Sequence, residues 1–123
     1  MKENENDNAV LVKSKAFALL IIRMYKYLTD EKKEFVLSKQ VLRSGTSIGA
    51  NIKESLYAQS KADFYAKLHI ATKEAGETEY WLELLHEGGY LDDNTFTKLN
   101  DHCSEIIKLL VSITKTQKKM TIV

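Results

Sequence analysis

Hydrophobic residues recur at alternating steps of three and four along most of this chain, and no proline interrupts them. The alternation runs without a miss from Phe64 to Leu85, and the segment from Phe96 to Ile113 repeats it. This spacing puts one apolar stripe on each helix. A chain without proline can also hold long helices without a kink. The pattern therefore predicts an all-α protein.

Four helical segments follow one another with short polar or glycine-containing links. Short links force sequential helices to run antiparallel, and no internal repeat of fixed period suggests a solenoid. We therefore predict one domain, an antiparallel, up-down-up-down four-helix bundle over residues 9–118. It lies between a disordered tail at residues 1–8 and a second tail at residues 119–123. The predicted helices cover about residues 9–28, 36 or 38 to 58, 60–87, and 92 or 93 to 116.

The apolar stripes predict the core, and local residues predict the helix ends. Ser60 and Asp63 resemble a capping box, Gly88 and Gly89 end the third helix, and Asp92 or Asp93 can cap the fourth. The predicted core residues are Val10, Phe17, Leu20, Ile21, Met24, Leu28, Leu37, Val41, Ile48, Ile52, Phe64, Leu68, Ala71, Ala75, Thr78, Leu82, Leu85, Phe96, Leu99, Cys103, Ile106, Leu110 and Ile113.

Neither the first eight residues nor the most apolar stretch predicts a membrane protein. Residues 1–8 are polar and acidic, unlike the basic start and apolar run of a signal peptide. The apolar stretch from Ala16 to Ile22 is far shorter than the roughly twenty residues that cross a bilayer. We expect a cytoplasmic protein with no membrane partner.

The first two predicted helices carry features that one bundle core does not explain. Helix one has apolar residues beyond its stripe, so a second copy of the chain is expected to cover it. In helix two, Gly45 and Gly49 lie one turn apart, and each costs close to 1 kcal/mol relative to alanine. A tight helix crossing would offset that cost. The predicted oligomer interface comprises Leu11, Val12, Leu19, Ile22, Gly45 and Gly49.

The segments that match catalytic and metal-binding motifs lack the surrounding features that those motifs require. Residues 45–49 match the G-x-S-x-G of hydrolases, but no strand precedes Ser47, and that motif works only on a strand-to-helix turn. His86 and Glu87 begin an HExxH pattern whose second histidine is missing. The single cysteine, Cys103, is predicted to be a core residue. We predict no enzyme, no cofactor, no metal and no small-molecule substrate.

The inward-facing carboxylates suggest a structural network instead. Helical bundles can hold two metals with Glu and Glu-x-x-His ligands, but no Glu-x-x-His occurs here. One or both of Glu74 and Glu77 are expected to pair with Arg43 or Lys53 across helices two and three. Such a pair sets the register of the helices more than it adds stability.

Charge is unevenly distributed although the net charge is +1. Residues 9–61 are basic and residues 62–107 are acidic. This separation would steer a polyanion to one face, or bring the basic face of one copy to the acidic face of the next. It is equally typical of solvated helix surfaces. The residues assigned to nucleic-acid binding are Lys13, Arg23, Lys26, Lys39, Arg43 and Lys53.

The run LRSGTSIGANIKESLYAQSKADFYAKLHIATKEAGETEYWLELL, which begins at Leu42, resembles the four helix bundle family of bacterial proteins whose first members were found encoded in intervening sequences of 23S ribosomal RNA genes. Lys53 and Ser55 depart from residues common in the family. The matching signature positions are Arg43, Ser44, Ser47, Asn51, Glu54, Glu74, Glu77, Trp81 and Leu82.

The resemblance implies a homopentameric ring with a central channel and no known enzymatic activity. A related branch, the accessory variability determinant proteins of diversity-generating retroelements, associates with a reverse transcriptase and RNA through a basic surface. The near-neutral charge of this chain departs from that strongly basic branch.

Two functions follow as alternatives. The first is a homo-oligomeric bundle that binds RNA, or a nucleic-acid-associated protein, through its first two helices. The second is a protein-binding scaffold without nucleic-acid binding.

Overall fold

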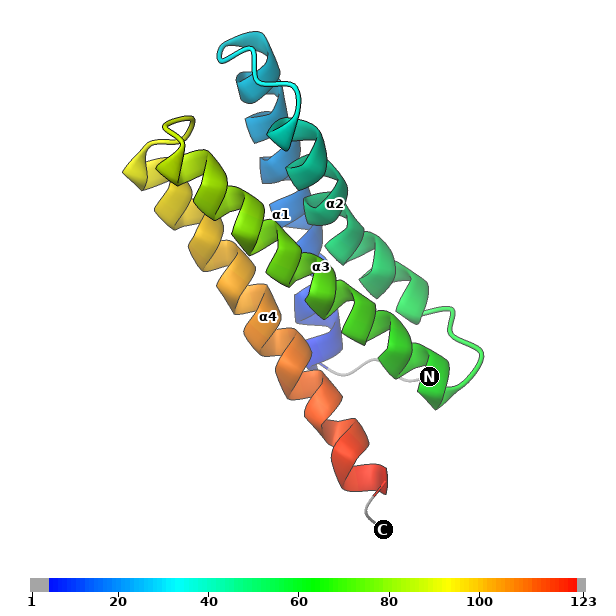
Figure 1. Cartoon of the computed structure of the whole chain (residues 1–123). Helices are drawn as coiled ribbons and strands as arrows, with labels where there is room; N and C mark the ends of the chain where they lie inside the picture. The colour runs from blue at the N-terminus through cyan, green and yellow to red at the C-terminus, as the bar shows by residue number, and fades with distance from the viewer. Residues whose placement is uncertain (1–4, 122–123) are drawn as a thin grey trace.

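The structure, a computed structural model, describes residues 5–121, with side chains described from residue 8 to residue 116. It consists of four helices, α1 (Glu5–Asp30), α2 (Leu37–Ser55), α3 (Lys61–Glu87) and α4 (Asp93–Thr121). Sequential helices run in opposite directions, as Figure 1 shows from blue to red. The predicted four-helix bundle is confirmed.

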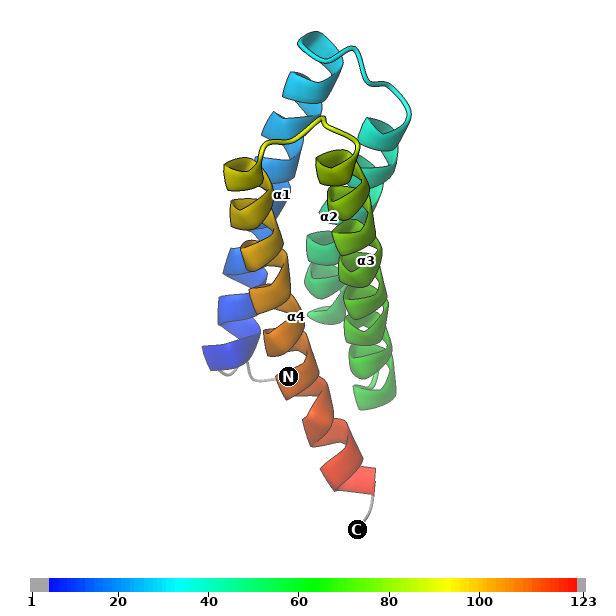
Figure 2. The ribbon, with the colours of Figure 1, turned by 60° about the vertical axis from the view of Figure 1, so that its left-hand side comes forward.

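The helices form a four-membered ring in cross-section. Each packs against the helices before and after it, α4 also packs against α1, and the two diagonal pairs do not meet within the described residues. The α1–α4 pair makes the least extensive contact of the four. The far end of α4 projects past the other three helices (Figure 2).

The two outer helices extend beyond their predicted ends. Helix α1 begins at Glu5, inside the segment assigned to a disordered tail, and residues 1–4 lie outside the described part of the chain. Helix α4 continues to Thr121, past the predicted end at about Thr116. Helix α2 is shorter than predicted, since residues 56–58 lie outside it. The apolar periodicity marks only buried turns, so it cannot locate the last exposed turn of a helix.

The predicted core is confirmed almost throughout. Of the residues predicted from the apolar stripes, all are buried except Leu20, Leu37 and Phe96, which are half-buried at the edge of the core. Cys103 is fully buried, and its thiol lies 3.4 Å from the carbonyl oxygen of Ala75. Burial, with a smaller contribution from the charge of Glu79, raises the pKa of this thiol to about 12.

The predicted caps of α3 and α4 are confirmed. The Ser60 hydroxyl accepts a hydrogen bond from the Asp63 backbone N–H at 3.1 Å. Gly88 caps the other end of α3, and Gly89 has a φ of 87°, which favours glycine. The Asp92 carboxylate accepts from the Thr95 N–H at 2.7 Å at the start of α4.

Helix α2 has a cap that the sequence patterns did not predict. The Glu34 carboxylate accepts hydrogen bonds from the backbone N–H groups of Leu37 at 3.0 Å and Ser38 at 2.7 Å. Partial burial raises the pKa of Glu34, but the hydrogen bonds together outweigh it and the net pKa is lowered. A glutamate three residues before a helix matches no common N-cap pattern, so the sequence alone assigns Glu34 to a polar break.

The glycines of α2 produce the predicted tight crossing, and its partner is α1 of the same chain. A Cβ on Gly45 would lie 2.9 Å from Ile21 Cγ1, and one on Gly49 would lie 3.3 Å from Ser14 Oγ. Gly45 is buried in this contact. In this fold, Gly45 is therefore not accessible to a second copy of the chain.

Candidate functional site

A polar cluster joins α2 to α3 at the surface. Arg43 Nη1 lies 3.1 Å from Glu74 Oε2, and Arg43 Nη2 is bonded to Glu77 Oε2. Trp81 Nε1 donates to the same Glu77 oxygen at 2.9 Å. The predicted pairing is confirmed for Arg43, which pairs with both glutamates. Lys53 forms no ion pair within the described residues.

The cluster shifts the protonation equilibria of its own members. The N–H of Trp81, and then the guanidinium of Arg43, lower the pKa of Glu77 against the opposing effect of burial. The bond to Glu77 in turn raises the pKa of Arg43. The Glu77 carboxylate is therefore ionised and already hydrogen-bonded to Arg43 and Trp81. Such a group suits fixing the register of α2 against α3 better than transferring a proton.

Beneath this cluster lies a buried polar contact between the same helices. The Thr78 hydroxyl is 2.8 Å from Ser44 Oγ, and both residues are fully buried. Because a buried hydroxyl needs a partner, this bond fixes the pairing of the two helices.

The remaining signature residues bond within their own helix, join α2 to α3, or lie in the core. Ser47 Oγ donates to the Arg43 carbonyl at 2.6 Å, and Asn51 Nδ2 donates to the Ser47 carbonyl at 2.8 Å. Ser47 lies in the middle of α2, which confirms that residues 45–49 do not form the turn of a hydrolase elbow. Glu54 lies 3.2 Å from Lys67 Nζ, and Leu82 is buried.

The six cations assigned to nucleic-acid binding fall into two groups. Lys13 pairs with Glu105 at 2.7 Å, and Arg43 belongs to the polar cluster. Arg23, Lys26, Lys39 and Lys53 are exposed, and none has an ion pair in the part of the chain that the structure describes.

An apolar groove lies between α1 and α2, with a volume of about 480 Å³. Three residues with small side chains or none line it, Ala18 from α1 and Gly49 and Ala50 from α2. Beside it, Val12 is 62% exposed, Leu19 52% and Ile22 36%, so the predicted surplus of apolar surface on α1 is present. The groove is lined by Leu11, Val12, Ser14, Lys15, Ala18, Thr46, Gly49, Ala50 and Lys53.

The groove as such was not predicted, although some of its residues were assigned to an interface. Lys15, Thr46 and Ala50 contribute to it only because of how α1 crosses α2. The spacing of Gly45 and Gly49 predicted a close crossing, but not which residues of α1 and α2 would line a groove beside it.

The described residues offer neither a metal site nor a membrane span. No three His, Cys, Asp or Glu side chains gather there in a way that could hold a metal ion. None of the helices in this part of the chain combines the length and apolarity that a bilayer span requires.

Comparison with known proteins identifies a family and a similar solved structure. The model of the family described as 23S rRNA-intervening sequence protein matches residues 6–112. A crystal structure of a protein of unknown function from the S23 ribosomal protein family of Bacteroides thetaiotaomicron is similar, with 57% identity and a TM-score of 0.89. The match covers 89% of this chain and 98% of that one. None of the curated proteins compared matches the chain.

Proposed function

This chain belongs to the 23S rRNA-intervening sequence protein family, and from that premise we propose that it is a non-enzymatic protein that assembles with copies of itself and acts by binding another macromolecule. The observation that carries the proposal is the apolar surface of α1. Val12, Leu19 and Ile22 are exposed beside the α1–α2 groove, and soluble monomers rarely leave such a patch uncovered.

The occupant of this surface is a second copy of the chain. Lys15 and Lys53 line the groove without ion pairs among the described residues, and residues 62–107, which include the exposed Glu83 and Glu87 of α3, are acidic. Contact between unlike faces is head-to-tail and closes into a ring when its rotation allows. The number of copies, five, comes from the family resemblance.

Light scattering at micromolar concentration tests the assembly. A ring of five copies of a 14.1 kDa chain gives about 70 kDa, five times the single mass. Leu19→Glu puts a charge into the apolar surface and should give smaller species. Tyr57→Glu is the matched control, since Tyr57 is 76% exposed in the turn after α2. A mass near 14.1 kDa for the unchanged protein contradicts self-assembly, and a clean dimer contradicts the ring.

We further propose that the macromolecule bound is RNA. The support is the set of exposed cations on α1 and α2 that have no ion pair in the described part of the chain, Arg23, Lys26, Lys39 and Lys53. Cations that neutralise phosphates release counterions, so the affinity should fall steeply with salt.

A salt titration with structured RNA separates this proposal from the alternative of a protein-binding scaffold. Replacing Lys26 and Lys39, which are exposed and do not line the groove, with glutamine should weaken binding and reduce the salt slope by about 1 for each phosphate that is no longer neutralised. Lys108→Gln, on the exposed side of α4, is the control. Absence of RNA binding at low salt favours the scaffold and leaves self-assembly untouched.

The proposal of no enzymatic activity has its own test at Ser47. Because the hydroxyl donates to a carbonyl of its own helix, Ser47→Ala should leave ester hydrolysis at background. Covalent labelling of Ser47 by a fluorophosphonate would contradict this.

A further inference from the structure

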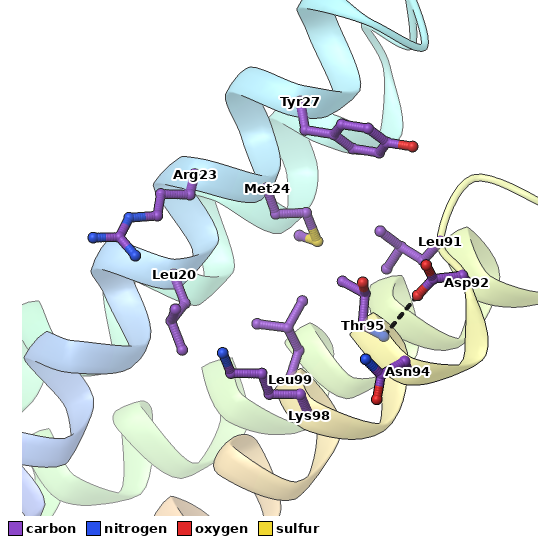
Figure 3. A pocket seen from close by; sticks show the side chains of 10 residues that line it. All are labelled: Leu20, Arg23, Met24, Tyr27, Leu91, Asp92, Asn94, Thr95, Lys98 and Leu99. Carbon is purple, nitrogen blue, oxygen red and sulfur yellow. Dashed lines mark hydrogen bonds between the residues drawn. The ribbon is translucent and has the colours of Figure 1, made fainter.

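A second depression lies between α1 and α4, at the end of the bundle where α3 turns into α4 (Figure 3). Its volume is about 500 Å³, within the range of about 300–1,000 Å³ that is usual for small-molecule sites. Its floor is apolar and consists of the side chains of Leu20 and Met24 from α1 and of Leu91 and Leu99 beside them.

This pocket follows from the order of the helices. Turns hold α1 to α2 and α3 to α4, but no turn joins α1 to α4 at this end (Figure 2). Further along, Lys13 and Glu105 bridge the two helices at 2.7 Å. Toward Leu91, no hydrogen bond or ion pair links α1 to α4 among the described residues.

Two cations line the pocket beside the apolar floor. Arg23 lines the pocket from α1 and Lys98 lines it from α4, and neither has an ion pair in the described part of the chain. Lys32 Nζ lies 5.9 Å from the centre of the Tyr27 ring, which also lines the pocket. Figure 3 shows Arg23 and Lys98 on the side near Leu20, with Tyr27 near the opposite end.

The one carboxylate in the lining is already engaged. Asp92 accepts a hydrogen bond from the Thr95 N–H at 2.7 Å, drawn as the dashed line in Figure 3. That bond lowers the pKa of Asp92, so its charge stabilises the start of α4. Because Asp92 is bonded to the start of α4, Arg23 and Lys98 have no ion-pair partner among the described residues beside the apolar floor.

We propose that this pocket binds a small anionic amphiphile, whose acidic group lies between Arg23 and Lys98 and whose hydrocarbon part covers Leu20, Met24, Leu91 and Leu99. The apolar floor disfavours a purely polar anion, and Arg23 and Lys98 disfavour a cationic amphiphile. The guanidinium of Arg23 points outward in Figure 3, but its exposed, flexible side chain can rotate toward the pocket.

Methyl NMR with decanoate as the ligand tests this proposal. Residues 20 to 27 of α1 span about 10 Å, a length comparable to the decanoate chain. The chain has three methionines, Met1, Met24 and Met120, so Met24→Leu assigns the Met24 methyl signal. Added below its micelle concentration, decanoate should shift the Met24 methyl and leave those of Met1 and Met120 in place.

Charge variants test whether Arg23 and Lys98 bind the acidic group of the ligand. Reversing Arg23 and Lys98 to glutamate should weaken decanoate binding by about tenfold or more, since a charge-assisted bond is lost at each position. Lys108→Glu, on the same helix but outside the pocket, should bind as the unchanged protein does. All three positions are exposed, so the variants should fold, which circular dichroism checks.

Three outcomes overturn the proposal. The first is that decyltrimethylammonium shifts the Met24 methyl as strongly as decanoate does, and the second is that the charge reversals leave the affinity unchanged. The third is a Met24 signal that responds only to protein concentration, which would identify a second copy as the occupant. None of these results depends on RNA binding or on the α1–α2 groove.

Discussion

Helix α2 and the α1–α4 seam are opposite extremes of packing within one small bundle. Helix α2 lies against α1 through Gly45, and it is bonded to α3 through Ser44 and Arg43. The α1–α4 seam has one exposed ion pair among the described residues and a pocket of about 500 Å³. The signature residues of the family resemblance lie on α2 and α3, the closed side.

The contrast separates what maintains the fold from what is available for binding. On the closed side, polar groups pair with one another and glycine lets the backbones meet. In the pocket on the open side, Arg23 and Lys98 have no ion pair among the described residues, and apolar side chains form a floor. Substitutions at the buried positions of α2 should therefore cost stability, and substitutions at the α1–α4 seam should affect binding.

The largest expected effect is at Gly45. Gly45→Leu places a side chain where even a Cβ would lie 2.9 Å from Ile21, so overpacking should lower the free energy of unfolding by about 3 kcal/mol. Gly76→Leu is the matched control, because Gly76 is exposed on α3 and a Cβ there would meet no atom within 4 Å. It should raise the free energy of unfolding by about 0.5–1 kcal/mol through helix propensity.

Urea unfolding at one fixed protein concentration measures both variants, since assembly makes stability depend on concentration. If Gly45→Leu and Gly76→Leu unfold at the same urea concentration, the α1–α2 contact is looser than the packing around Gly45 implies.

A smaller loss is expected for Thr78→Val, which removes one partner of the buried hydrogen bond. Ser44 is left with a buried hydroxyl that has lost this bond, at a cost of about 1–2 kcal/mol. Adding Ser44→Ala removes that unsatisfied group, so the double variant should be more stable than the sum of the single changes predicts. Strict additivity in urea unfolding would show that the two hydroxyls do not interact.

The surface cluster should contribute less, and its contribution should depend on pH. The pKa of Glu77 is below its ordinary value of 4.5, so ionised Glu77 stabilises the fold above that pH, and the effect disappears as the pH falls through the lowered pKa. Glu77→Gln should cost about 0.5 kcal/mol at pH 7, after allowance for solvent screening of this partly exposed pair.

Unfolding curves at several pH values between 7 and about 3 measure this effect. The unchanged protein should lose stability below pH 4.5 more steeply than Glu77→Gln does. Parallel curves would mean that Glu77 titrates normally and that Arg43 and Trp81 do not hold its charge.

The smallest effect is expected at the open seam. Lys13→Gln removes the ion pair with Glu105, whose side chains are 42% and 52% exposed, so water already screens the attraction. The melting temperature should not change measurably. A clear drop would show that this bridge holds α1 to α4 and that the seam is not intrinsically open.

The sequence predicted the closed side far better than the open one. Stripes at steps of three and four identify buried positions directly, and the spacing of Gly45 and Gly49 predicted a tight crossing. The pairing of Arg43 with Glu74 and Glu77 was also predicted from the sequence, because these opposite charges lie near the apolar stripes by which α2 and α3 face each other. These features depend on one helix, or on two joined by a short turn.

The α1–α4 pocket could not be predicted in this way. Leu20 has the same spacing as its buried neighbours, yet it is half-buried because α4 does not cover it. The crossing of the first and last helices depends on all the contacts around the ring. The start of α2 was predicted to within one residue, but its cap was not, because the capping side chain, Glu34, lies outside the helix.

Cys103, the only thiol of the chain, gives access to the kinetics of the bundle. Alkylating reagents attack the thiolate, and this thiol is fully buried with a pKa of about 12, so it should react only during transient opening of α4 from α3. When closing outpaces alkylation, the ratio of the observed rate to that of a free thiol gives the free energy of opening. Alkylation of Cys103 therefore measures how often the native bundle opens, and no cysteine needs to be introduced or removed for the measurement.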